Sequence, residues 1–230
     1  MLYLIRLEMK KINFSKYIKI SFLIYLVYAA FWCLLIWSRK HNVTFYHLEN
    51  YRDIFKSIHI VNIMTFIIYA SVLLSRLVIE EFRSKTIKIL SMYPINQKKI
   101  LFSKILLVMI FTFINIILSD VISTSVFIGF NYLMKIISGE ITTAIFMNHT
   151  IFVVLSSIEA SLICILPLYF GMRNYSVPST IISSCLIAMI LEEYNNLVPS
   201  FNLNTILPIL LSILGLVVSY HIINKDKNYT

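Results

Sequence analysis

Two acidic residues within otherwise apolar stretches are the first candidates for chemistry. Asp120 lies in the outer third of its stretch, about 22 Å along a helix from the inner end, and Glu159 lies near the middle of VVLSSIEASLICIL. Because a carboxylate is costly in apolar surroundings, each should face protein or water, and each is a candidate functional residue. A polar contact that only fixes helix packing is the alternative, and the sequence leaves both interpretations open.

Glu192 and Glu193 lie near the end of another apolar stretch. Together with Asp120 and Glu140, they would form an acidic opening that attracts cationic peptides. Ordinary solvated carboxylates at a membrane edge are the simpler interpretation, and the sequence favours it.

The chain lacks the residue patterns of the enzymes that it could be mistaken for. The glutamate pairs at 80–81 and 192–193 resemble those of membrane-embedded proteases, but neither pair is followed by the arginine of that motif. The one Phe-x-x-x-His, Phe55 to His59, precedes both pairs, and the histidines have no metal-ligand spacing. No glycine precedes a lysine, so the phosphate-binding loop of ATPases is absent. We therefore expect no catalytic residue, metal site or bound cofactor in this chain.

The composition indicates an integral membrane protein. Of the 230 residues, 59% are hydrophobic and 13% are charged, and the mean hydropathy is +0.82. Soluble domains are about half apolar and about a quarter charged, so a soluble core could not hide this much apolar surface. The apolar stretches are continuous rather than alternating, which favours helices over a β-barrel. The net charge is +9, and the Lys and Arg residues that produce it flank these stretches. Their position indicates a membrane surface rather than nucleic acid as the partner.

Six apolar stretches predict transmembrane helices, because a bilayer is crossed by about 20 helical residues. The expected spans are 20–37, 58–78, 105–127, 150–170, 178–195 and 205–223, all within one all-α domain over 1–230. Residues 2–19 predict an interfacial segment or a basic tail that sets topology. The region 128–149 has room for a re-entrant or interfacial piece. Most Lys and Arg residues fall on the side of the two termini, which predicts that both termini are cytoplasmic.

The stretch EEFRSKTIKILSMYPINQKKILFSK, residues 80–104, is charged although it lies between two apolar spans. Pro94 cannot continue a helix, and Asn96 can cap a new one that leads into the third span. The pattern predicts a short amphipathic helix along the inner membrane face, followed by a sharp turn. Docking of a soluble partner and ordinary positive-inside loop chemistry both remain open at this point. The apolar stripe of this helix comprises Phe82, Thr86, Ile89, Leu90 and Tyr93, and the opposite face comprises Glu81, Lys85 and Lys88.

This segment resembles the signature segment of bacterial type-2 ABC transporter permeases. The closest branch serves lantibiotic immunity, antimicrobial-peptide resistance and peptide export. Lys85 stands where many members of the family have glycine. The length, the six spans and the inside termini extend the resemblance over the whole chain. The matching residues are Glu81, Thr86, Leu90, Pro94, Ile95, Lys99, Ile100 and Lys104.

The resemblance implies a permease subunit of an ATP-driven exporter in the bacterial cell membrane. ATP and magnesium would be bound by a separate ATPase dimer, and a second permease subunit, identical or homologous, would complete the path for an amphipathic or antimicrobial peptide. A six-span scaffold or regulator is the alternative function. Neither the substrate nor the choice between self-immunity and peptide secretion can be read from the sequence. The implied ATPase-docking residues are Glu80, Glu81, Arg83, Lys85, Thr86 and Pro94, with Arg173 as a secondary contact.

Overall fold

A computed structural model describes residues 9, 14–40, 51–84, 97–134, 143–197 and 206–225 of the chain. This described part is helical and contains no strand, which confirms the prediction of an all-α membrane protein. The elements are α2 (Ser15–Lys40), α3 (Tyr51–Leu74), the π-helix η1 (Ser75–Ile79), α4 (Glu80–Arg83), α6 (Gln97–Met134), α7 (Thr143–Ile163), α8 (Leu166–Asn174), α9 (Val177–Leu197) and α10 (Ile206–Lys225).

Five helical stretches in the described residues are long and apolar enough to cross a membrane. α10, with 20 residues, is a sixth apolar helix in the described part of the chain, and its apolar stretch Ile206–Gly215 is shorter than these five. The described residues therefore contain six apolar helices, as predicted, but only five of them are long enough by this measure to count as full spans. The five stretches are Ser15–Leu35, Tyr51–Arg83, Lys99–Met134, Ile145–Arg173 and Val177–Tyr194.

Several helices extend beyond their predicted ends. α6 has 38 residues, which corresponds to about 57 Å, whereas the hydrocarbon core of a bilayer is about 30 Å thick. Residues 128–134 continue α6 instead of forming a re-entrant piece, and residues 15–19 belong to α2 instead of an interfacial segment. Residues 143–149 of the second segment begin α7. At the start of α2, hydropathy detects only the lipid-soluble part, whereas the backbone hydrogen bonds begin earlier; at the end of α6, the apolar stretch itself reaches Met134. Residues 2–8, 10–13 and 135–142 of the two predicted segments lie outside the described residues.

Prolines and one left-handed residue divide the second half of the chain into helices. α7 ends before Pro167, which lies in the first turn of α8, where the missing N–H group costs nothing. α8 ends at Asn174, and the next residue, Tyr175, has a left-handed φ of 48°. Pro178 then lies in the first turn of α9. These breaks turn α9 back along the bundle, where it packs beside α3.

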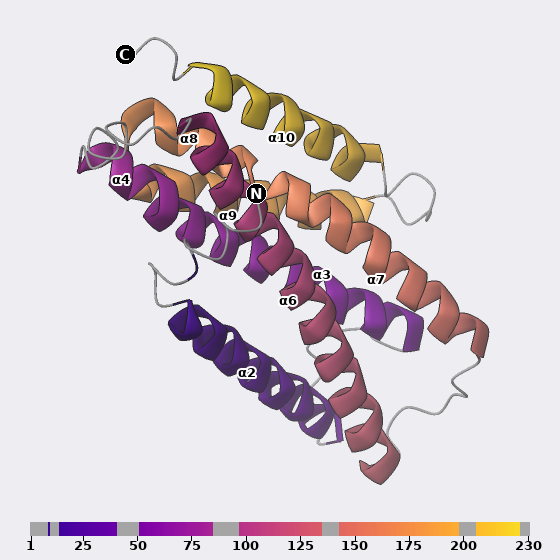
Figure 1. Cartoon of the computed structure of the whole chain (residues 1–230). Coiled ribbons are helices and arrows are strands. Elements are labelled where there is room, and N and C mark those ends of the chain that lie inside the picture. The colour runs from indigo at the N-terminus through magenta and orange to yellow at the C-terminus, as the bar shows by residue number, and fades with distance from the viewer. Residues whose placement is uncertain are drawn as a thin grey trace.

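α3 is the central helix of the bundle, and it packs against α6, α7 and α9. Figure 1 shows α2 beside α6 at one edge and α10 at the opposite edge. Because lipid is as apolar as leucine, polar and small residues must add to the packing between helices. Ser71 on α3 and Ser184 on α9 share a buried hydrogen bond of 2.8 Å. At Gly215, a Cβ atom would lie 2.5 Å from the Leu162 carbonyl oxygen, so glycine permits the close contact of α10 with α7.

Candidate functional site

The predicted docking segment begins as a direct extension of α3. α3 continues through η1 into α4 without a break, so the three elements form one continuous helical rod with α4 at its end. Glu80 and Arg83 are exposed, whereas Glu81 and Phe82 are half-buried. A π-helical turn is rare and often occurs at functional sites. Lys85, Thr86 and Pro94 lie outside the described residues, and their docking role stays a prediction.

Lys104 of α6 binds α4 and η1 through two contacts. Its ammonium group is ion-paired with the Glu81 carboxylate, and it donates a hydrogen bond to the Leu77 carbonyl oxygen, 3.1 Å away. The Lys104 side chain is 3% exposed and that of Glu81 is 15% exposed. Glu81 therefore points towards α6, and the ion pair fastens α4 to the start of the third span. It joins the first and last residues of the signature pattern.

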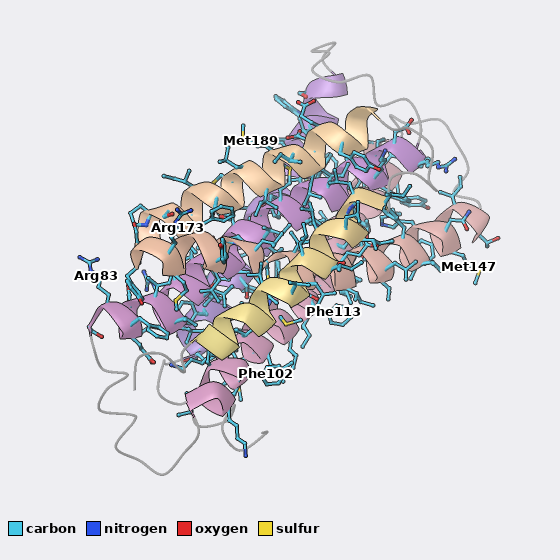
Figure 2. All side chains as sticks on the ribbon, turned by 90° about the horizontal axis from the view of Figure 1, so that it is seen from above. Arg83, Phe102, Phe113, Met147, Arg173 and Met189 are labelled. Carbon is cyan, nitrogen blue, oxygen red and sulfur yellow. The ribbon has the colours of Figure 1, made fainter. Side chains whose placement is uncertain are left out.

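The second predicted docking position lies beside the first. The Tyr175 ring, at the turn between α8 and α9, stacks on Phe82 with ring centroids 6.0 Å apart and 28° between the ring planes. Arg173 is exposed, and Figure 2 shows it at the same end of the bundle as Arg83. We call the three exposed charged residues Glu80, Arg83 and Arg173 the docking surface.

A close backbone approach also links the two docking segments. A Cβ atom on Gly171 would lie 2.3 Å from Ile79 Cδ1 and 2.8 Å from the Thr180 side chain. Glycine therefore lets α8 lie against η1 at a distance that a larger residue would prevent. The contact makes η1, α8 and the start of α9 one packed unit beneath the docking surface.

The predicted intramembrane carboxylates differ in their surroundings. Glu159 is half-buried in the middle of α7, and its carboxylate has no hydrogen bond or ion pair among the described residues. Glu192 and Glu193 are exposed near the end of α9. Asp120 is only 3% exposed. It therefore does not contribute to an exposed acidic opening, because α3, α6 and α7 enclose it.

Asp120 is the centre of a polar cluster formed by those three helices. Its Oδ1 atom lies 3.1 Å from His59 Nδ1 and 3.3 Å from Asn62 Nδ2, both on α3. Its Oδ2 atom lies 3.0 Å from His149 Nε2 on α7. The other ring nitrogen of His59 contacts the Ser156 hydroxyl, also on α7. We call these five residues the buried polar cluster; it links three transmembrane helices through one carboxylate.

His59 and His149 are candidates that the sequence patterns did not indicate. They lie far from Asp120 along the chain, and their spacing matches no metal motif. Within the described ranges no group of three metal-ligating side chains has the geometry of a metal site. One signal was available, because His59 and Asn62 are three residues apart and place two polar groups on one face of an apolar span. Which helix faces them could not be read from that signal.

Comparisons with known proteins agree with this architecture. A family model described as ABC-2 family transporter protein matches residues 4–192. The chain is 32% identical over 229 residues to the uncharacterized protein YcbO of Bacillus subtilis strain 168, covering 97% of this chain and 98% of that protein. No solved structure matches.

Proposed function

Because the chain belongs to the ABC-2 family of transporter proteins and is a membrane permease subunit of an ABC transporter, we propose that an ATPase subunit binds it at the docking surface. The observation that carries the proposal is the position of Glu80, Arg83 and Arg173. Arg83 and Arg173 come from two segments far apart in sequence and lie at one end of the bundle (Figure 2), and Glu80 belongs to the same short helix as Arg83. Two exposed cations and a carboxylate suit a soluble protein partner with complementary charge.

The packing beneath the docking surface supports a route for mechanical coupling. A force on α4 acts directly on α3, because η1 connects them as one rod. The Glu81–Lys104 ion pair passes the same force to α6. Closure of the ATPase on ATP would then tilt α3 against α6 and change access to the path as a rigid-body movement.

The remaining parts of the transporter are also proposals. ATP and magnesium bind to the partner ATPase dimer, since this chain carries no phosphate-binding glycine loop. A second permease subunit, identical or homologous, completes the enclosure of the path. Both termini and the docking surface face the cytoplasm, in agreement with the distribution of Lys and Arg.

We assign amphipathic, cationic antimicrobial peptides as the substrate class. The support is the resemblance of the signature segment, together with exposed carboxylates at Glu192 and Glu193. These residues lie near the far end of α9, whose first residues adjoin the docking end. A negative surface there raises the local concentration of cationic substrate. Glu159, half-buried and unpaired among the described residues, is the candidate for a contact within the path.

Charge reversal at the docking surface tests the proposal. Arg83→Glu and Arg173→Glu, alone and together, should reduce co-purification of the partner ABC ATPase when the two proteins are co-expressed. Both side chains are exposed, so the variants should fold and insert normally. Arg52→Glu is the matched control, because Arg52 is also exposed but stands at the other end of α3.

The expected result is that the double variant no longer co-purifies with the ATPase. The Arg52→Glu variant should co-purify with as much ATPase as the wild type does. Equal co-purification by wild type and double variant would reject the docking surface while leaving the family assignment intact.

A further inference from the structure

The contacts of the buried polar cluster require one proton more than an ionised Asp120 and two neutral histidines carry. Ser156 Oγ lies 2.5 Å from the Phe152 carbonyl oxygen and also contacts His59 Nε2. A hydroxyl has one hydrogen and a carbonyl oxygen is only an acceptor, so the hydroxyl donates to Phe152. His59 Nε2 must then donate to the hydroxyl oxygen.

The other ring nitrogen of His59 also has the position of a donor. His59 Nδ1 faces Asp120 Oδ1, and an ionised carboxylate only accepts hydrogen bonds. An imidazole with two N–H donors is protonated and carries a positive charge. When Asp120 is ionised, the contacts of His59 are therefore those of an imidazolium, with one partner that is an anion and one that is a hydroxyl oxygen.

This charge state also balances the burial of the cluster. His59 is 0% exposed and Asp120 is 3% exposed. A lone carboxylate at this depth would be costly, whereas an imidazolium next to it makes the pair neutral. Asn62 Nδ2 donates to the same carboxylate, and His149 needs to supply only one N–H group, as a neutral ring does.

We propose that His59, Asp120 and His149 form a buried proton-binding site, in which a proton on His59 pairs it with Asp120 and holds α3 against α6 and α7. The nitrogen–oxygen distances of 3.0 and 3.1 Å are those of N–H···O hydrogen bonds. The two histidines also face different oxygens of the carboxylate. A proton therefore fits the observed contacts better than a shared metal ion does.

The groups around the site come from each helix packed against α3. Asp120 approaches His59 from α6, and the His149 ring from α7 lies edge-on with its centroid 6.3 Å away. Lys56 lies one turn earlier on α3. α9, which also packs on α3, carries Glu192 and Glu193 near its end, and both are exposed.

The position of the site connects the proton to the proposed movement of the helices. His59 and Glu80 belong to the same helical rod, about 31 Å apart along its axis at about 1.5 Å per residue. The proton site fastens one part of this rod while the ATPase would act on the other. This consequence rests on the proposed function, whereas the proton site itself does not.

Nitrogen NMR of the purified permease, labelled with ¹⁵N-histidine and held in lipid at about pH 7, tests the site. We expect one histidine with both ring nitrogens protonated, and the loss of that signal in His59→Gln and in Asp120→Asn. The control is His221→Gln, on α10, which should keep the signal. Ser156→Ala is a milder variant, and it should move the resonance of one imidazolium nitrogen without removing the ring charge.

Three results in the absence of added metal would overturn the proton site. They are the absence of any imidazolium signal in the wild type, its survival in folded His59→Gln, and an unmoved signal in Ser156→Ala. Added zinc that shifts both His59 and His149 to metal-bound positions would also overturn it, in favour of a metal site. None of these measurements involves the ATPase, so a failure here leaves the docking proposal standing, and a failure of docking leaves the proton site standing.

Discussion

Removal of the Lys104 charge should destabilise the permease more than removal of both charges of its ion pair. Lys104→Met deletes the ammonium group and leaves the Glu81 carboxylate in the interface between α4 and α6, where its side chain is 15% exposed. Loss of one partner of a buried pair costs about 3–5 kcal/mol. Because the carboxylate retains some contact with water, the lower end, about 3 kcal/mol, applies here.

The expected loss is large enough to measure by thermal unfolding. For a chain of this length, about 1 kcal/mol corresponds to about 2–4 °C, so Lys104→Met should lower Tm by about 6–12 °C. Glu81→Gln also breaks the pair, but it leaves the ammonium group its hydrogen bond to the Leu77 carbonyl oxygen. The double variant Glu81→Gln, Lys104→Met leaves no unpaired charge in the interface and should recover part of the loss.

A double-mutant cycle on the purified permease in one detergent provides the assay. The two losses should be non-additive by more than about 1 kcal/mol, since the residues are in direct contact. Additive losses, or a Tm of Lys104→Met equal to that of wild type, would refute the conclusion that this pair fastens α4 to α6. Lys99→Met serves as the control, because Lys99 lies on the same helix but is exposed.

Three further predictions follow from single positions. Gly171→Ala should destabilise the chain by about 1–3 kcal/mol because the added methyl group overlaps its neighbours. The control Gly129→Ala should stabilise the chain slightly, since a Cβ atom there would have nothing within 4 Å. Equal Tm changes in the two variants would contradict the close packing at Gly171. Glu192→Gln with Glu193→Gln should reduce protection of cells against cationic peptides, and unchanged protection would reject the acidic opening. Glu159→Gln should lower transport at unchanged Tm if this residue lines the path; a lower Tm with normal transport would instead assign it to helix packing.

Much of the architecture could be predicted because local chemistry determines it. Long apolar runs give the helices, and Pro178 marks the start of a predicted span through its missing N–H group. Pro167 lies inside the predicted span 150–170, which the structure divides into α7 and α8. The helix starts were less accurate, since the polar residues that begin α3 and α6 are helical without being lipid-soluble. Hydropathy does not report such residues.

The candidate site was predicted only in part, because its contacts join distant parts of the chain. Asp120 was identifiable from its apolar surroundings, but His59 and His149 reach it from two other helices. Glu81 was expected to face a soluble partner, whereas Lys104 draws its carboxylate towards α6. A helical wheel shows which residues share a face of a helix, but it does not show which other helix packs against that face.

Photo-crosslinking from the docking surface tests the central claim most directly. A photoreactive amino acid at position 83 or 173, in cells that express the complete transporter, should form a covalent adduct with the ATPase subunit. The same amino acid at position 52, exposed at the other end of α3, should not. Adducts from 83 and 173 but not from 52 are the predicted result. Adducts from 52 alone would contradict the assignment of this end of the bundle as the ATPase-binding surface.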